Sequence, residues 1–187
     1  MKLFRFAQIC FSLVFVLSAC IFTTTTAEPQ SNVIPAATFV QDWFSMEMTD
    51  VQTGKTFTMN DYAGKVVLLE TMAIWCPNCV IQATQVAKLH EALGNPDDLI
   101  SVNLDVDSHE DEATLKEYAS SYRFDWHFAV APLLVARALG NLYSAEYLNP
   151  PLSPMLIIDR AGNAHQLDYG VKNAETLRKI VGPYLSK

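Results

Sequence analysis

The sequence is poor in cysteine, with only four in 187 residues. Two of them, Cys10 and Cys20, fall in the first twenty residues, which leaves Cys76 and Cys79 for the rest of the chain. A small domain held together by disulfides carries more cysteines, and a closed zinc site needs about four ligands. The four histidines are scattered without the spacing of metal ligands. The remaining cysteine pair therefore favours redox chemistry over structural bracing or zinc binding.

Basic residues are also scarce, at 13 Lys and Arg against 20 Asp and Glu, for a net charge of −7. No basic patch stands out, so the composition disfavours binding to nucleic acid or to anionic lipid. The sequence has no internal repeats and no low-complexity tract. Its length predicts one domain with a core of its own at residues 38–187.

The first 19 residues have the pattern of a secretion signal, because Lys2 and Arg5 precede an apolar run at residues 6–16. Without these two residues, 11 basic residues face 20 acidic ones, a net charge of −9. The stretch Leu17-Ser18-Ala19-Cys20 resembles a bacterial lipobox, in which the cysteine becomes the lipidated first residue of the mature chain. The alternatives are ordinary cleavage after Ala27 and an uncleaved anchor.

Residues 20–37 contain Thr, Pro and Ser with little apolar periodicity, which predicts a flexible tether. Together with a lipid on Cys20, this tether would hold the domain at a membrane outside the cytoplasm, in a periplasm or on the outer face of the cell. Disulfides persist in such compartments. A secreted soluble protein is the alternative localisation.

The segment Trp75-Cys76-Pro77-Asn78-Cys79 lies between an apolar run at residues 66–69 and a helix-like stretch at residues 80–93. A CxxC motif at a strand-to-helix junction is typical of thiol–disulfide redox sites. A helix N-terminus lowers a thiol pKa from about 8.5 into a range of about 3.5–7.5, and the thiolate is the attacking species. Pro77 suits the first helical turn, where its missing N–H has no partner to lose.

Glu70 interrupts the apolar strand predicted at residues 66–72, six residues before Cys76. Burying a carboxylate is costly and favours its protonated form. We therefore expect Glu70 to accept the proton that Cys79 loses during the reaction. The alternative is a glutamate that reaches solvent at the end of the strand.

The remaining pattern is that of an α/β domain. A strand pair is predicted at residues 39–59. It is followed by the strand–CxxC–helix unit, a strand at 99–106, and a helix to Tyr122 with Ser108 as its N-cap. A strand at 126–130, a helix at 132–143 and a polar-aromatic loop at 144–153 come next. The chain closes with a hairpin of strands at 155–158 and 164–169 and a helix from Asn173 through Val181.

This order resembles a thioredoxin fold, and specifically the exported, membrane-tethered TlpA/ResA-like thiol–disulfide oxidoreductases. The resemblance covers nearly all of residues 39–185, and its markers are residues 62–67, the CxxC segment, and Ser153-Pro154 before residues 155–162. It implies a central mixed β-sheet flanked by helices, with an N-terminal β-strand extension.

The resemblance also implies residue roles. Cys76 would be the exposed attacking thiol and Cys79 the buried resolving thiol. Pro154 would be a cis-proline that faces the disulfide and keeps a backbone edge open for substrate, and Glu70 would match the buried acid of thioredoxin. The substrate-binding residues would be Trp75, Pro77, Asn78, Ser153 and, in a loop longer than usual, Tyr147.

The function implied is reduction of protein disulfides, serving haem attachment to apocytochrome c or the assembly of a copper-site protein. Electrons would come from a membrane thiol donor, and the Cys76–Cys79 disulfide would act without a further cofactor or metal. A disulfide oxidase and a copper-binding metallochaperone are the alternatives. A peroxidase of this fold places Thr three residues before the attacking cysteine, where this chain has Ala73.

Overall fold

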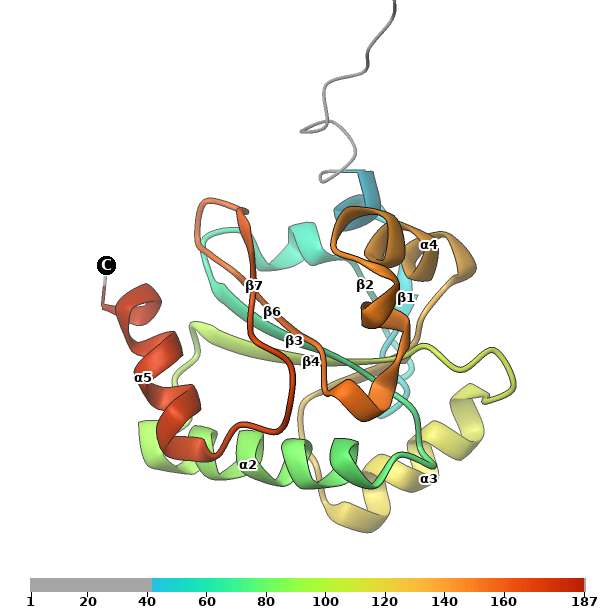
Figure 1. Ribbon diagram of the computed structural model, residues 1–187, viewed down its shortest axis with the longest axis horizontal. Helices are drawn as coiled ribbons and strands as arrows, with labels where there is room; N and C mark the ends of the chain where they lie inside the picture. Colours follow the sequence, from blue (N-terminus) through green and yellow to red (C-terminus); the bar gives the residue numbers. More distant parts are fainter. Residues whose placement is uncertain (1–41, 187) are drawn as a thin grey trace, which may run out of the picture. The chain divides into compact units, whose positions relative to one another are not determined.

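The computed structural model describes residues 42–186, so the predicted signal peptide at 1–19, Cys20 and the tether at 20–37 lie outside the described residues. A five-stranded mixed sheet in the order β5-β4-β3-β6-β7 forms the centre of the domain (Figure 1). The pairs β3–β4 and β4–β5 are parallel, and the pairs β3–β6 and β6–β7 are antiparallel. The strands are β3 (Val66–Met72), β4 (Leu99–Asp105), β5 (His127–Val130), β6 (Met155–Ile158) and β7 (Ala164–Gln166).

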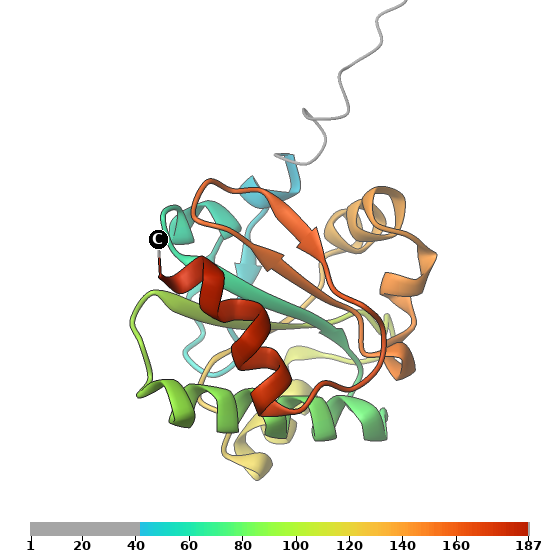
Figure 2. The ribbon, with the colours of Figure 1, turned by 60° about the vertical axis from the view of Figure 1, so that its left-hand side comes forward.

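Helices cover both faces of the sheet, as Figures 1 and 2 show. All seven residues of β3 are buried, which matches a strand covered on both sides. Val66 and Leu68 pack with α2 (Pro77–Leu93) and α5 (Ala174–Leu185), whereas Val67 and Leu69 pack with α4 (Leu133–Leu142). Helix α3 (Glu112–Tyr122) shares a cluster with Met72 and α2. The thioredoxin-like fold predicted from the sequence is therefore confirmed.

The N-terminal extension is smaller than predicted. Its two strands, β1 (Met48–Thr49) and β2 (Thr56–Phe57), form a short antiparallel pair. The expected start of the first strand is instead a 3-10 turn, η1 (Trp43–Ser45), and a second such turn, η2 (Met59–Tyr62), follows β2. Trp43 and Phe44 pack edge to face in the core, with ring centroids 4.6 Å apart, so burial of the two rings outweighs the alternating strand pattern.

The helix boundaries show two further differences. Asp111, not Ser108, is the N-cap of α3, because its side chain accepts the Thr114 N–H at 2.9 Å in a capping box. Asn173 caps α5 as predicted, but the helix runs through Pro183 to Leu185. Within residues 42–186, no helix has the length and apolar character needed to span a bilayer.

The carboxyl edge of the parallel strands carries the features that concern function. Helix α2 starts soon after β3 ends, and an acidic turn follows β4. The segment predicted as a loop before β6 contains two 3-10 turns at this edge, η3 (Ala145–Leu148) and η4 (Pro150–Leu152). Turn η4 contacts α2 and β3. We refer to η4 as the cap.

Candidate active site

The two cysteines form a disulfide across the first turn of α2, with their Cα atoms 5.3 Å apart. Cys76 is the helix N-cap and Pro77 begins the helix. The Cys76 sulfur accepts the backbone N–H of Cys79 at 3.3 Å. That N–H also donates to Cys76 O at 3.2 Å. It belongs to the first turn of the helix, where the N–H groups and the helix dipole stabilise negative charge on Cys76 after reduction.

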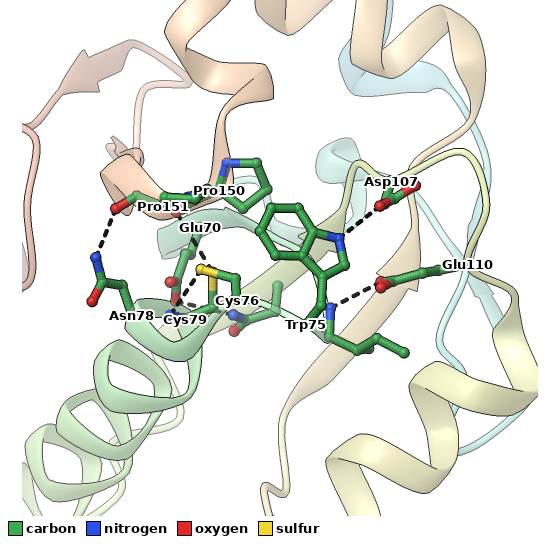
Figure 3. The surroundings of a disulfide bond; sticks show 11 residues. Glu70, Trp75, Cys76, Asn78, Cys79, Asp107, Glu110, Pro150 and Pro151 are labelled. Carbon is green, nitrogen blue, oxygen red and sulfur yellow. Dashed lines mark hydrogen bonds between the residues drawn. A yellow bond between two sulfur atoms is a disulfide. The ribbon is translucent and has the colours of Figure 1, made fainter.

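The cap covers this disulfide, as Figure 3 shows. Cys79 Sγ lies 3.5 Å from the carbonyl oxygen of Pro150, and the Asn78 side-chain amide donates to the carbonyl oxygen of Pro151 at 2.8 Å. Cys76 is only 1% exposed and Cys79 is fully buried. The expectation of an exposed Cys76 is therefore wrong for this conformation, because the long segment before β6 folds back over the sulfurs.

Trp75 stands beside the disulfide with 56% of its surface exposed. Its indole N–H donates to Asp107 at 2.7 Å (Figure 3). The same carboxylate accepts the backbone N–H of His109 and pairs with the His109 ring at 2.9 Å. The hydrogen bonds from His109 and Trp75 lower the pKa of Asp107 to about 2, so this carboxylate is ionised at neutral pH.

Glu70 is 1% exposed, so it does not reach solvent at a strand end. It lies between Leu68 and Met72 on β3, and both of these neighbours pack toward α2. One carboxyl oxygen accepts the Asn103 amide at 3.0 Å, and the other has no partner within residues 42–186. Burial raises the pKa of Glu70 to about 8.

Residues 29–181 match the Redoxin family. The chain belongs to the redoxin family. A search of curated protein sequences found no match.

Solved structures share the fold of this redoxin. A thiol:disulfide interchange protein from Chlorobium tepidum is 17% identical, with a TM-score of 0.60 over 75% of this chain and 92% of that one. A secreted disulfide oxidoreductase of Mycobacterium tuberculosis, homologous to E. coli DsbE, is 17% identical, with a TM-score of 0.57 over 78% and 98%. BsSco, a member of the Sco family of cytochrome c oxidase assembly proteins, is 18% identical, with a TM-score of 0.58 over 73% and 89%. With its cysteine pair at a helix start, this redoxin is a thiol–disulfide oxidoreductase.

The segment before β6 differs from the expectation in two ways. The Ser153–Pro154 peptide bond is trans, not cis, and Ser153 adopts a left-handed conformation at φ 48°. The backbone edge before Pro154 is also occupied. Ser153 N–H donates to Pro150 O at 2.8 Å, and Leu152 O accepts the Gly170 N–H at 2.7 Å. The prediction of a cis-proline beside an open edge is therefore wrong here, because η4 and the segment after β7 satisfy these backbone groups.

Tyr147 does not line the substrate edge, so that prediction is also wrong. Its side chain is fully buried, and its hydroxyl donates to the carbonyl oxygen of Met155 at 2.8 Å. Turn η3 packs on α4, which turns Tyr147 into the core and leaves Leu148 41% exposed at the surface. Ser153 is likewise fully buried. Trp75 and Asn78 are exposed beside the sulfurs, and their contact with a substrate stays a prediction.

Sequence reasoning missed a pair of acids behind the CxxC segment. Asp105 ends β4 in the core, and burial together with the neighbouring Glu110 carboxyl group raises the pKa of Asp105 to about 8. Glu110 in turn accepts the backbone N–H of Ile74 at 2.9 Å (Figure 3). Through this bond, Glu110 supports the backbone that leads to Cys76. Acids directly after a parallel strand are the signal in the sequence that points to these residues.

A second missed feature is the contact between Gln82 and Lys172. Gln82 is fully buried in α2, and its amide donates to Lys172 O at 3.1 Å and accepts Lys172 N–H at 2.7 Å. The segment after β7 is thereby fixed to the active-site helix. The Lys172 ammonium is close enough to Glu70 to favour its ionised form, against the larger effect of burial. Within residues 42–186, no three His, Cys, Asp or Glu side chains gather as a metal site would require.

Proposed function

We propose that this redoxin reduces disulfides in partner proteins outside the cytoplasm. The observation that carries the exchange chemistry is the position of Cys76 as the N-cap of α2, with its sulfur accepting the Cys79 N–H at 3.3 Å, whereas the reducing direction follows from the TlpA/ResA-like resemblance. That geometry stabilises a thiolate on Cys76 in the reduced state. Asn78, Pro77 and Trp75 flank the sulfurs and would contact the partner.

The reaction transfers two electrons from the dithiol to the partner's disulfide. The Cys76 thiolate attacks one partner sulfur, forms a mixed disulfide, and releases the other partner sulfur as a thiolate. Cys79 then loses its proton and attacks the Cys76 sulfur of the mixed disulfide. The Cys76–Cys79 disulfide closes, and the second partner thiolate leaves.

Glu70 is the group we propose as the acceptor of the Cys79 proton. It faces α2 from the buried strand, and its pKa of about 8 lies near the pH at which the exchange would run. A base with a pKa near the operating pH can take up and return a proton within each cycle. The carboxyl oxygen of Glu70 that has no partner within residues 42–186 is available for this proton.

Attack on the disulfide requires the cap to move. The carbonyl oxygens of Pro150 and Pro151 lie against Cys79 and Asn78, and neither sulfur is exposed. An incoming thiolate must approach along the line of the S–S bond. We therefore place a cap-opening step before each exchange with a partner.

We propose a TlpA/ResA-like subtype that is tethered to a membrane by a lipid on Cys20. The lipobox-like stretch before Cys20 and the tether composition at residues 20–37 support this proposal. An apocytochrome c or a copper-site protein is the partner class we favour, with electrons from a membrane thiol donor. The structural neighbours that share the fold of this chain include a homologue of E. coli DsbE and a Sco-family protein.

Two measurements test this function. The redox potential of the Cys76–Cys79 pair separates a reductase, near −270 mV, from a strong oxidant, near −120 mV. A Cys79→Ala variant should retain its partner as a mixed disulfide on Cys76, which mass spectrometry would identify. A potential near −120 mV would assign the opposite direction, and a domain that exchanges with no test disulfide would refute the function.

A further inference from the structure

A pocket of about 290 Å³ lies beside the disulfide. Trp75 and Pro150 connect the pocket with the disulfide. Trp75 lines the pocket and directly precedes Cys76, while Pro150 lines the pocket and places its carbonyl oxygen 3.5 Å from Cys79 Sγ. Any group that fills this pocket is therefore adjacent to the bond that is exchanged.

One side of the pocket is apolar. Trp75 is 56% exposed and Leu148 is 41% exposed, and both contribute surface to the pocket together with Pro150. An exposed indole ring and an exposed leucine offer contact area to an aliphatic chain. The face of an indole also attracts cations.

The polar side of the pocket consists of Asp107, Ser108 and His109, and Asp107 is the acid among them. Asp107 lines it and is 21% exposed, and the bonds from His109 and Trp75 keep its carboxylate ionised. The residues that line the pocket include no Lys or Arg. Asp105 accepts the Asp107 N–H at 3.0 Å and holds the backbone of this turn, but its raised pKa of about 8 keeps it mostly protonated at neutral pH, so the negative charge of the pocket is that of Asp107. Negative charge at one end of an apolar pocket matches a side chain with an aliphatic stem and a cationic head.

We propose that this pocket binds a lysine or arginine side chain that lies next to the reactive cysteine of the partner protein. The stem lies against Trp75 and Leu148, and the cation pairs with Asp107. Because Pro150 is also part of the cap, the bound residue contacts the segment that must move. The inference rests on the proposed function and names the kind of partner sequence that this site selects.

The test uses reduced protein and short peptides whose single cysteine is disulfide-linked to thionitrobenzoate. Cys76 attacks the peptide sulfur and releases thionitrobenzoate, which absorbs visible light, and Cys79 then releases the peptide thiol as the Cys76–Cys79 disulfide closes. The residue beside the peptide cysteine is Lys, Arg, norleucine or Glu. We expect Lys and Arg peptides to react about two- to five-fold faster than the norleucine peptide, as for a partly exposed ion pair, and the Glu peptide to react slowest.

Asp107→Asn should bring the ratio of Lys to norleucine rates close to one, while the asparagine oxygen still accepts the Trp75 indole N–H. The matched control is Asp97→Asn, which removes the same charge from an exposed acid just before β4, at the opposite edge of the sheet. This control should keep the preference for Lys. High salt should weaken the preference in the wild-type protein, because it screens exposed charges.

Three results would overturn the proposal. They are a norleucine peptide that reacts as fast as the Lys peptide, a preference for Lys that survives in Asp107→Asn, and an equal loss in both variants. The thionitrobenzoate disulfide of mercaptoethanol, which is small and has no cationic group, serves as the reference substrate. If reduced protein does not exchange with it, the proposed function fails; if it does, and the peptide preference is absent, only the pocket assignment fails.

Discussion

Removing the side-chain amide of Asn78 tests whether the cap limits access to the disulfide. In Asn78→Ala, the hydrogen bond of 2.8 Å to Pro151 O is lost, while Leu152 O keeps its bond to Gly170 N–H. A hydrogen bond between neutral groups contributes about 0.5–1.5 kcal/mol net. The population of open cap should therefore rise about 2- to 12-fold, since about 1.4 kcal/mol corresponds to a factor of ten.

The assay is reduction of the oxidised protein by dithiothreitol, at concentrations where the rate is proportional to the reductant. Aliquots are alkylated and the free thiols are counted by mass spectrometry. If cap opening precedes exchange in a fast equilibrium, the rate constant increases by the same factor as the open population. The reverse reaction with oxidised dithiothreitol should accelerate equally, so the redox potential should not change.

Asn149→Ala is the matched control, because Asn149 is exposed in the same segment and its side chain makes no hydrogen bond within residues 42–186. This variant should react at the wild-type rate. An Asn78→Ala protein with an unchanged rate would refute the idea that the cap restricts access. A change in one direction only, with a shifted potential, would mean that Asn78 acts on the cysteines themselves.

Three other predictions concern buried groups. The pKa of Glu70 is raised from 4.5 to about 8 in the folded state. Between these pH values the native protein therefore binds a proton that the unfolded chain has released. The free energy of unfolding should fall as pH rises through this window. Glu70→Gln should remove up to about 1.4 kcal/mol per pH unit of this decline in urea unfolding, and a wild-type slope in the variant would contradict the assignment. Asp105→Asn should flatten the same curve, because the pKa of Asp105 is raised in the same direction, and Glu117→Gln on the exposed face of α3 should not. Tyr147→Phe should cost only about 0.5–1.5 kcal/mol of unfolding free energy, because Met155 O still accepts the Leu167 N–H at 3.0 Å; a larger loss would show that the hydroxyl has another role.

The sequence predicted those parts of the fold that depend on neighbouring residues. Three such local signals are the apolar run of β3, the turn into α2 at Pro77 and Asn173 as the N-cap residue of α5. Each lies where it was expected. A buried Glu70 followed from its place in an apolar strand, which the structure covers on both faces.

The arrangement around the disulfide could not be predicted in the same way, because it depends on contacts between distant segments. Asn78 and Pro151 are 73 residues apart, and Ile74 and Glu110 are 36 residues apart. No periodicity encodes such pairs. The composition of residues 144–153 predicts only a loop. The two 3-10 turns of this segment bury Tyr147 and cover the sulfurs, and they result from packing on α4 and α2.

The backbone groups beside Pro154 have a consequence for recognition. While the cap is closed, Ser153 N–H and Leu152 O are bonded within the domain, so a partner cannot dock there by adding a strand, a mode in which main-chain hydrogen bonds supply the affinity. Selectivity must then come from side chains around the sulfurs.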